Sequence, residues 1–409
     1  MKRILSILLI LALLCAALPA MAAEEYPEPE RFETDALTWD FDKSTGTLTI
    51  GGSGPMRSYM TEDAEWMSFS DEVRHVVIRE GVTSVGECAF YGFTNLTSAV
   101  LPDSIEIVDN YAFYYCQSLR SITIPANLTY AGRMCFYNTL LWEPADLVFP
   151  EGMAYIGEEA FHSALKTEGK IVIPSTVEYI GRCAFTNAMF SDIEAAAENP
   201  CYKSEAHALL TKDGTELIAY APCAKETAYA VPEGVTKIHA ECFNVVMNLV
   251  SLSIPASVTE IEEGAIFSTF ALTDITVAED NPAYKAAEGF LLTADGKTLL
   301  AYPDGIAADK IDVPEGVERI GAYVFCGRTA EGLALTMPGA LKTIGELSMP
   351  CGIDRLSVPK GLTTIEAYAF PYAGGVSEIF HGGSEADWNS VSIGEGNEGL
   401  EGAHLHFSE

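Results

Sequence analysis

The sequence is short of positive charge. Lysine and arginine number 24 against 58 aspartates and glutamates, which gives a formal net charge of −34. A surface this acidic repels phosphate groups, so the composition argues against nucleic acid as a partner and against simple electrostatic binding to anionic lipid. The excess of acid has two interpretations, and both stay open: solubility outside the cell, or attraction of a cationic partner.

Long apolar runs are also scarce. Residues 4–18 form one such run, which Lys2 and Arg3 precede, and Ala20 and Ala22 follow it at the positions that a signal peptidase recognises. The run is too short to span a bilayer comfortably, and the whole pattern is typical of a secretory signal peptide. We therefore predict a signal peptide at 1–22, no membrane span after its cleavage, and an extracellular protein, either secreted or associated with a cell surface.

Groups that carry chemistry are few as well. The seven histidines form no His-x-x-x-His zinc pair, and alternation in a terminal strand explains His404 and His406 better than metal binding does. Residues 394–399 match the Gly-x-Gly-x-x-Gly pattern of dinucleotide-binding sites, but they lack the preceding strand and following helix that such a site needs. We expect no catalytic, cofactor-binding or metal-binding residues, no cofactor and no enzymatic activity. One disulfide, between Cys201 and Cys223, is left open.

What the sequence does contain is a repeat. A short β-branched run that ends in proline recurs about every 23 residues. Its positions are Pro102, Pro125, Pro150, Pro174, Pro232, Pro255, Pro314, Pro338 and Pro359, with Arg79 in the same place one period earlier. Two steps are long, and we interpret each as one period plus an insertion of about 35 residues. This gives about ten repeats.

Apolar residues recur at fixed distances after each proline. The third and sixth positions are mostly Val, Ile or Leu, and the eleventh is Phe except at Ile266 and Met349. The phenylalanines are Phe90, Phe113, Phe136, Phe161, Phe185, Phe243, Phe325 and Phe370. In a stack of coils each such column becomes a continuous internal ladder. The alternating run before the proline predicts a strand of a parallel sheet, and the Ala-Phe step predicts a short helical turn.

These columns resemble the BspA-type leucine-rich repeat, whose consensus reads roughly Leu-x-x-Ile-x-Ile-Pro-x-x-Val-x-x-Ile-Gly-x-x-Ala-Phe-x-x-Cys. Residues 119–125 and 177–185 match it closely, although the final cysteine survives only as Cys116. The resemblance implies a leucine-rich-repeat solenoid, mostly β with short helical turns, capped by terminal β segments. It also implies secretion or surface display, and a role in adhesion or in binding host or bacterial macromolecules. It carries over no catalytic residue.

The flanks and the two insertions complete the predicted organisation. Residues 23–75 are expected to form an N-terminal β-hairpin cap, 76–380 the solenoid, and 381–409 a C-terminal cap. The insertions, at about 195–230 and 278–312, each contain an Asn-Pro step and an Asp-Gly step. Each step in the second insertion lies 82 residues after its equivalent in the first. Asp-Gly between apolar runs predicts a hairpin turn. We expect two hairpins that project from one edge, either as tolerated family loops or as flaps that contact a ligand.

The candidate binding surface is the outward face of the strands before the prolines. Its residues are His75, Ser98, Ser121, Thr123, Lys170, Ser251, Ser253, Lys310, Asp312 and Arg355. The face is mildly polar and free of aromatic side chains in these columns, which makes it a poor sugar platform. The sequence therefore favours a monomeric binding or adhesion protein whose partner is a protein or glycoconjugate at a host or bacterial surface. The alternative is a structural spacer in a surface assembly, without a ligand of its own.

Overall fold

The computed structural model describes residues 36–59, 64–141, 145–166, 168–327, 329–370 and 375–408. The predicted signal peptide, 1–22, lies outside the described residues. The fold divides into two compact units, whose described residues run from 36 to 224 and from 225 to 408. Each unit has its own coil, and the class is the predicted one: a mostly-β parallel solenoid with very little helix.

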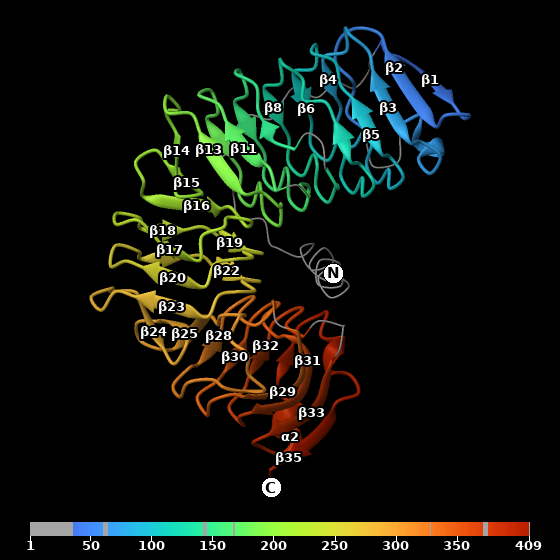
Figure 1. The fold of residues 1–409 in the computed structure, drawn as a ribbon. Coiled ribbons are helices and arrows are strands. Elements are labelled where there is room, and N and C mark those ends of the chain that lie inside the picture. Colours follow the sequence, from blue (N-terminus) through green and yellow to red (C-terminus); the bar gives the residue numbers. More distant parts are fainter. Residues whose placement is uncertain are drawn as a thin grey trace. The chain divides into compact units, whose positions relative to one another are not determined.

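In the first unit the strands fall into two parallel ladders (Figure 1). The first ladder carries the runs before the prolines and one further strand at each end: β2 (Thr47–Gly51), β3 (His75–Ile78), β5 (Ser98–Val100), β7 (Ser121–Ile122), β9 (Leu147–Val148), β11 (Lys170–Ile173) and β13 (Asp192–Ala195). The second comprises β4 (Ser84–Val85), β6 (Ile107–Val108), β8 (Tyr130–Ala131), β10 (Tyr155–Ile156) and β12 (Tyr179–Ile180). Identical columns pair, as Ile156 does with Ile180, and both side chains are buried.

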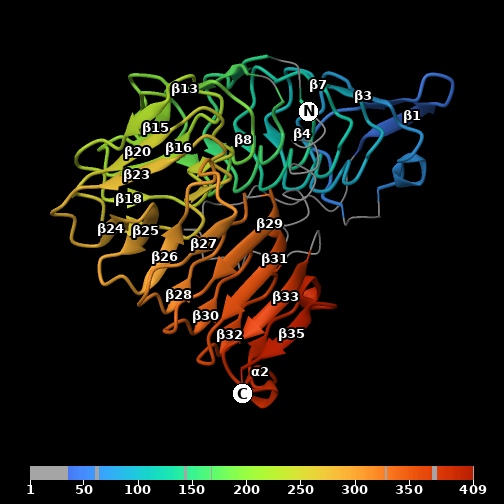
Figure 2. The same ribbon diagram turned by 60° about the horizontal axis from the view of Figure 1, so that its bottom comes forward.

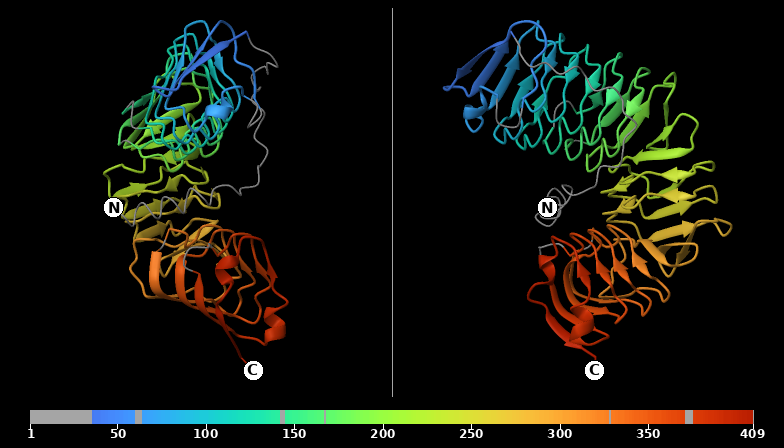
Figure 3. Two further views of the ribbon diagram at one scale, coloured as in Figure 1. Left: turned by 90° about the vertical axis from the view of Figure 1, so that its right-hand side faces the viewer. Right: turned by 180° about the vertical axis from the view of Figure 1, so that it is seen from behind.

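The unit opens with a hairpin. β1 (Thr38–Asp42) runs antiparallel to β2, which is itself paired in parallel with β3. Gly46 closes the turn with φ of 68°, and the Asp42 carboxylate accepts hydrogen bonds from the backbone N–H and the hydroxyl of Ser44. A short 3-10 helix, η2 (Met67–Phe69), follows. Figure 3 (left) looks nearly along the coil of this unit, so that successive turns overlap.

The third edge of the coil consists of hydrogen-bonded turns; the predicted helical turn at the Ala-Phe step does not form. We call this the turn edge. Residues two before and two after the phenylalanine column adopt positive φ, as Cys88 (57°) and Tyr115 (59°) do. Between these positions every second N–H points at the adjacent turn: the Phe90 N–H donates to the Ala112 carbonyl at 2.8 Å. The turns thus satisfy their backbone groups as a sheet would.

A stack of aromatic rings fills the coil behind this edge. The Phe113 ring lies 5.1 Å from that of Phe90 and 5.4 Å from that of Phe136, nearly parallel to both. Trp66 stacks on Phe90 at 6.0 Å, and its indole N–H donates to the Ala89 carbonyl at 2.8 Å. Trp66 therefore closes the N-terminal end of the phenylalanine column, and its one polar group is satisfied.

The first insertion is a three-stranded antiparallel meander of β14 (Tyr202–Glu205), β15 (Ala208–Thr211) and β16 (Glu216–Tyr220). The Asp-Gly turn is present: Gly214 has φ of 79°, and the Asp213 carboxylate accepts from the Thr215 N–H at 3.0 Å. Leu209 and Leu210 are fully buried. The central strand of the meander is therefore part of the core, and the insertion is not a free projection.

The second unit repeats this plan, and Figure 2 shows the later strands of its first ladder side by side. That ladder holds β17 (Ala228–Ala230), β20 (Ser251–Ile254), β23 (Asp274–Val277), β27 (Lys310–Asp312), β29 (Thr329–Thr336), β31 (Cys351–Val358), β33 (Val376–His381) and β35 (His404–Phe407). The second ladder holds β18 (Lys237–Ile238), β21 (Glu260–Ile261), β26 (Thr298–Ala301), β28 (Arg319–Ile320), β30 (Thr343–Ile344), β32 (Thr364–Ile365) and β34 (Ser392–Ile393). On the turn edge of this unit, β19 (Phe243–Asn244) pairs with β22 (Ile266–Phe267).

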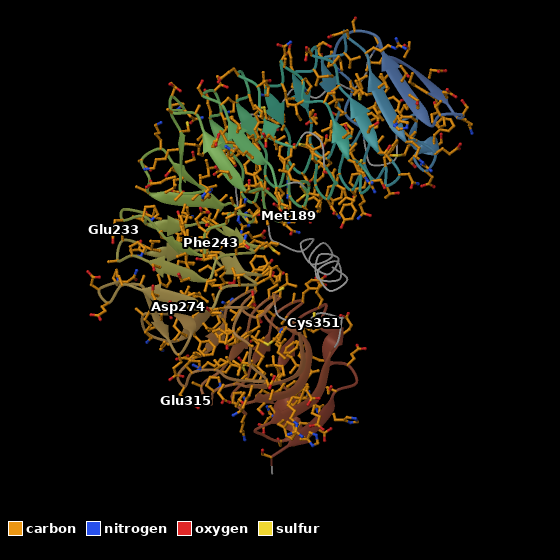
Figure 4. The ribbon with its side chains drawn as sticks, in the orientation of Figure 1. Met189, Glu233, Phe243, Asp274, Glu315 and Cys351 are labelled. Atoms are coloured by element: carbon orange, nitrogen blue, oxygen red, sulfur yellow. The ribbon has the colours of Figure 1, made fainter. Side chains whose placement is uncertain are left out.

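In Figure 4, Glu233, which follows a proline, lies on the far side of its turn from Phe243.

The second insertion supplies a rung of the coil. β24 (Tyr284–Ala287) and β25 (Phe290–Thr293) form a hairpin, and β25 pairs antiparallel with β26. β26 is in turn parallel to β28, with Thr298 opposite Arg319. The prediction of a hairpin that simply projects from the edge therefore needs correction, because its last strand belongs to the second ladder.

The solenoid has about 14 turns, so the predicted count of about ten was too low. β13 pairs in parallel with β11, and β23 pairs in parallel with β20. Each long step in the repeat therefore holds two turns, one of which lacks the proline phrase. The other additional rungs are β2 at the start and β33 and β35 at the end.

Helix is confined to short pieces in the described part of the chain. Near the C-terminus α2 (Glu385–Trp388) begins with a capping box between Ser384 and Asp387, and η3 (Glu398–Leu400) is a single 3-10 turn. Trp388 is buried against His381, with ring centroids 5.6 Å apart. Among the described residues, none of the helices has the length and apolar character that crossing a membrane requires.

Candidate binding surface

The predicted surface residues of the first unit lie in rows across the first ladder. Strand register places His75 beside Ser98 and Ser98 beside Ser121. The His75 Nδ1 atom lies 2.8 Å from the Ser98 hydroxyl oxygen. Thr123 is exposed on the same face, and its hydroxyl donates to the Leu101 carbonyl at 2.8 Å. These four residues form a small polar surface held by adjacent turns.

An apolar row runs beside them. Val77 is paired with Val100, and Val148 with Val172, in the outward column two places before the proline. Val100 is 45% exposed and Val148 is 51% exposed, although both belong to well-formed strands. We call these four residues the valine stripe. Thr123 stands in the same column between Val100 and Val148, so the stripe consists of two valine pairs. β-Branched side chains suit a strand, but exposed apolar side chains gathered on one face are also typical of contact surfaces.

Lys170 ends this face on β11. Its ammonium nitrogen lies 2.5 Å from the Glu194 carboxylate on the next strand, and its backbone N–H donates to Asp146 at 2.8 Å. Hydrogen bonding to Glu194 raises the pKa of Lys170. Both side chains of the pair are about half exposed, so solvent screens the pair and it adds little stability.

In the second unit the serines are neighbours on β20. Ser251 and Ser253 both point outward, and the Ser253 hydroxyl accepts from the Thr276 hydroxyl at 3.0 Å. Strand register places Ser251 opposite Asp274 on β23. The serines therefore form a second polar surface, separate from that of the first unit.

The charged candidates of this unit are each paired. The Lys310 ammonium lies 2.8 Å from the Asp312 carboxylate, and the Arg355 Nε lies 3.3 Å from the Glu378 carboxylate. The hydrogen bond from Lys310 lowers the pKa of Asp312. Five of the ten predicted residues lie in each unit, and within each unit they are spread over several strands of the first ladder.

Aromatic side chains do occur on the outward face at the end of the second unit. Phe380 on β33 is 36% exposed, and its ring stacks on His406 of β35 at 4.5 Å. The Arg355 guanidinium carbon lies 5.8 Å from the Phe380 ring centre. The sequence columns missed these residues because they were followed only as far as Pro359. The next turn has Gly382 at the proline position, and strand pairing places Phe380 beside Ser357. The available signal was the run Val376-Ser377-Glu378-Ile379-Phe380-His381 before that glycine.

Comparison with known proteins supports this architecture. The family model described as "BspA type Leucine rich repeat region" matches in six copies, over residues 66–196, 217–285 and 304–384. The chain belongs to the BspA-type leucine-rich repeat family. The resemblance of 119–125 and 177–185 to the family consensus is therefore confirmed.

The chain is similar to solved structures of leucine-rich repeat proteins, and the fold is shared with the first of those that follow. A leucine-rich repeat protein from Eubacterium ventriosum is 22% identical, with 92% of this chain and 95% of that chain covered and a TM-score of 0.55. A leucine rich cell surface protein from Faecalibacterium prausnitzii is 21% identical over 90% of this chain and 98% of its own, with a TM-score of 0.47. The pneumococcal vaccine antigen PcpA is 15% identical, with coverage of 94% and 100% and a TM-score of 0.47. No curated protein matches.

The described part of this BspA-type protein contains no group of three or more His, Cys, Asp or Glu side chains placed to hold a metal ion. Cys201 and Cys223 are not joined by a disulfide. Burial raises the pKa of the Cys223 thiol to about 11, so the thiol stays protonated and is a poor nucleophile at neutral pH. The arrangement offers contact surfaces and side-chain hydrogen bonds. That is consistent with a protein-interaction or structural role.

Proposed function

We propose that the protein is exported and binds a macromolecular partner, without catalysis, through the outward strand face of its first unit. The observation that carries this proposal is the valine stripe. Val100 and Val148 expose roughly half their surface in a face that also offers His75, Ser98 and Ser121. An apolar centre with a polar surround is the usual anatomy of a protein interface. The partner in this proposal is a protein or glycoconjugate at a host or bacterial surface, and the protein acts as a monomer.

Export is supported by the first 22 residues, with their basic start, apolar run and small residues before the predicted cleavage site. Expression of the full chain in a bacterial host, followed by N-terminal sequencing of the protein outside the cytoplasm, tests it. The expected new N-terminus is Ala23. Uncleaved protein retained in the cytoplasm contradicts export.

Binding is tested by immobilising residues 23–409 and exposing them to host-cell and bacterial surface extracts. We expect Val148→Asp to reduce capture of the partner at least about tenfold, because it puts a charge into the apolar centre of the contact. Ala126→Asp is the matched control, since it adds the same charge at an exposed turn position outside the face. Equal capture by both variants contradicts the strand face as the site.

A second candidate is a spacer without a ligand. It is favoured by the pairing of the charged surface residues with one another, as in Lys170 with Glu194 and Lys310 with Asp312. Charges that are satisfied within the face have less to offer a partner. The spacer hypothesis gains if the wild-type chain captures nothing from any extract, while its removal still alters the assembly at the cell surface.

A further inference from the structure

The turn edge of the first unit carries a cluster of tyrosines that the outward strand columns do not include. Tyr91 stacks on Tyr114 at 4.9 Å with an interplanar angle of 17°, and Tyr114 stacks on Tyr137 at 5.0 Å and 19°. Tyr111 stands across this stack, 5.7 Å from Tyr114 at 72°, and Tyr115 is tilted by 42° at 4.8 Å. Tyr137 is buried, while the other four are partly exposed.

The cluster is rigid because the backbone holds it on both sides. Tyr111 and Tyr115 have φ of 57° and 59°, and their N–H groups donate to carbonyls of the next turn, each at 2.9 Å. Burial raises the pKa of Tyr91, Tyr111 and Tyr114. The phenols therefore stay protonated over the whole physiological range and present O–H donors. A preorganised surface of this kind loses little entropy when it binds.

The surroundings are polar and not aliphatic. Thr94 and Gln117 are exposed, and Asn95 and Ser118 are partly exposed, in the same turns. Among the described residues, the large hydrophobic side chains that are well exposed lie elsewhere, the nearest in sequence being Val100. A protein contact normally has an apolar core, and this surface has aromatic rings surrounded by hydroxyl and amide groups instead.

An exposed amide and nearby negative charge complete the chemistry. Gln117 presents its side-chain amide on the surface two residues after Tyr115. Glu158 and Glu159 lie close enough to Tyr111 to act on its pKa. Carboxylates accept hydrogen bonds from sugar hydroxyls but repel anionic sugars.

We propose that Tyr91, Tyr111, Tyr114 and Tyr115 form a binding platform for a neutral glycan. Aromatic faces pack against the C–H faces of sugar rings, while the phenolic and amide groups bond to sugar hydroxyls. This inference rests on the proposed binding function and deepens it, because it names a partner class and a surface distinct from the valine stripe.

The test uses affinity electrophoresis of residues 23–409 in gels that contain a β-glucan, a galactan or a mannan, with polygalacturonate as the anionic counterpart. The platform variant is Tyr91→Thr/Tyr114→Asn/Tyr115→Asn. Tyr91 and Tyr114 directly follow a column phenylalanine, a position that the chain elsewhere fills with Thr186 and Asn244. Tyr115 comes one residue later, where other turns have Asn138 and Asn187. These replacements therefore suit the fold. The variant leaves the net charge unchanged, and its unfolding curve checks that it folds.

The matched control is Tyr155→Thr/Tyr179→Thr, which removes two stacked, partly exposed tyrosines from the second ladder of the same unit. We expect the wild-type chain and the control to be retarded by at least one neutral polysaccharide and not by polygalacturonate. The platform variant should bind about tenfold more weakly or not at all, as expected when aromatic contacts are lost.

Several results overturn the platform. These are a wild-type chain that binds none of the neutral polysaccharides, a platform variant that binds as the wild type does, or equal loss in the control. A platform variant that loses a captured protein partner instead identifies the cluster as a protein interface. If the wild type captures a partner through the valine stripe but binds no polysaccharide, the proposed function survives and the glycan platform does not. If it binds nothing at all, both fail.

Discussion

Asn199 and Asn281 occupy equivalent positions in the two insertions and make the same four hydrogen bonds. The Asn199 side-chain nitrogen donates to the carbonyls of Pro174 and Val177, and its oxygen accepts from the N–H groups of Cys201 and Tyr202. Asn281 makes the corresponding bonds at 2.7, 3.0, 2.9 and 2.8 Å. Each buried asparagine therefore connects an insertion to the turn before it, which explains why the Asn-Pro step appears in both.

Replacing such an asparagine leaves two N–H groups, one of them buried, and two carbonyls without their partner. We expect Asn281→Ala to lower the free energy of unfolding by about 3 kcal/mol, as measured by urea denaturation followed by circular dichroism. Asn127→Ala is the control, because Asn127 is exposed and its side-chain nitrogen donates to the Asp103 carbonyl at 2.7 Å. A loss for Asn281→Ala no larger than that of the control contradicts this role.

The phenylalanine column gives a second prediction. Phe136 is 1% exposed, between Phe113 and Phe161 at 5.4 and 5.2 Å. Truncation to alanine leaves a cavity in the stack, so we expect Phe136→Ala to cost roughly 4 kcal/mol of stability. Phe136→Met should cost less than about 1.5 kcal/mol, because it nearly conserves volume and Met349 already fills this column. Similar losses for both variants argue against a close-packed column.

The columns could be read from the sequence because three of them keep register over most of the chain. The core positions are confirmed at Ile156, Ile180 and Ile238, which are all buried. The backbone conformation of the turn edge could not be predicted from the sequence in this way. Its left-handed positions are held by residues such as Cys88 and Glu159, whose side chains carry no signal for positive φ.

The repeat count failed for a related reason. β13 is a full rung, but its sequence Asp-Ile-Glu-Ala is not followed by the proline that marked the other turns. The tyrosine platform was missed because only strand columns were searched for surface residues. The residue directly after the phenylalanine column, tyrosine at 91, 114 and 137, was the available signal.

Electrostatics across the second ladder can be tested at Glu318. Its carboxylate lies 2.8 Å from the Lys297 ammonium and also bonds to Lys342. Hydrogen bonds from the two lysines lower the pKa of Glu318 to about 2, from an ordinary 4.5. A depressed carboxyl pKa stabilises the fold above about pH 4.5, and this contribution is lost as the pH falls toward 2.

Carbon-13 NMR titration of the Glu318 carboxyl group measures this directly. We expect a midpoint near 2 at low ionic strength that moves toward 4.5 in molar salt, because the carboxylate is partly exposed and salt screens its attraction to the two lysines. Lys342→Gln should raise the midpoint, while Lys360→Gln, on a lysine that pairs elsewhere with Asp387, should leave it unchanged. A midpoint at 4.5 in low salt means that the lysine contacts do not persist in solution.

Acid sensitivity in the first unit should depend on His162. Its ring stacks on Tyr137 at 4.7 Å, and the residue is 1% exposed. Burial, with a smaller effect of the Lys166 charge, lowers the pKa of His162 to about 3, from an ordinary 6.5. Between these two values the unfolded chain binds a proton that the folded chain does not. The contribution of His162 to the free energy of unfolding is therefore fully present above about pH 6.5. Below that pH it is lost at about 1.4 kcal/mol per pH unit.

The variant His162→Tyr removes this titration and extends the tyrosine stack by one ring. We expect the free energy of unfolding of the wild type to fall by about 2 kcal/mol more than that of the variant between pH 7.5 and pH 5. The carboxylates titrate in both proteins, so their contribution cancels in this comparison. If His162→Tyr loses as much stability as the wild type over this range, the imidazole at 162 is already protonated in the folded chain, and the close stacking on Tyr137 cannot be its resting arrangement.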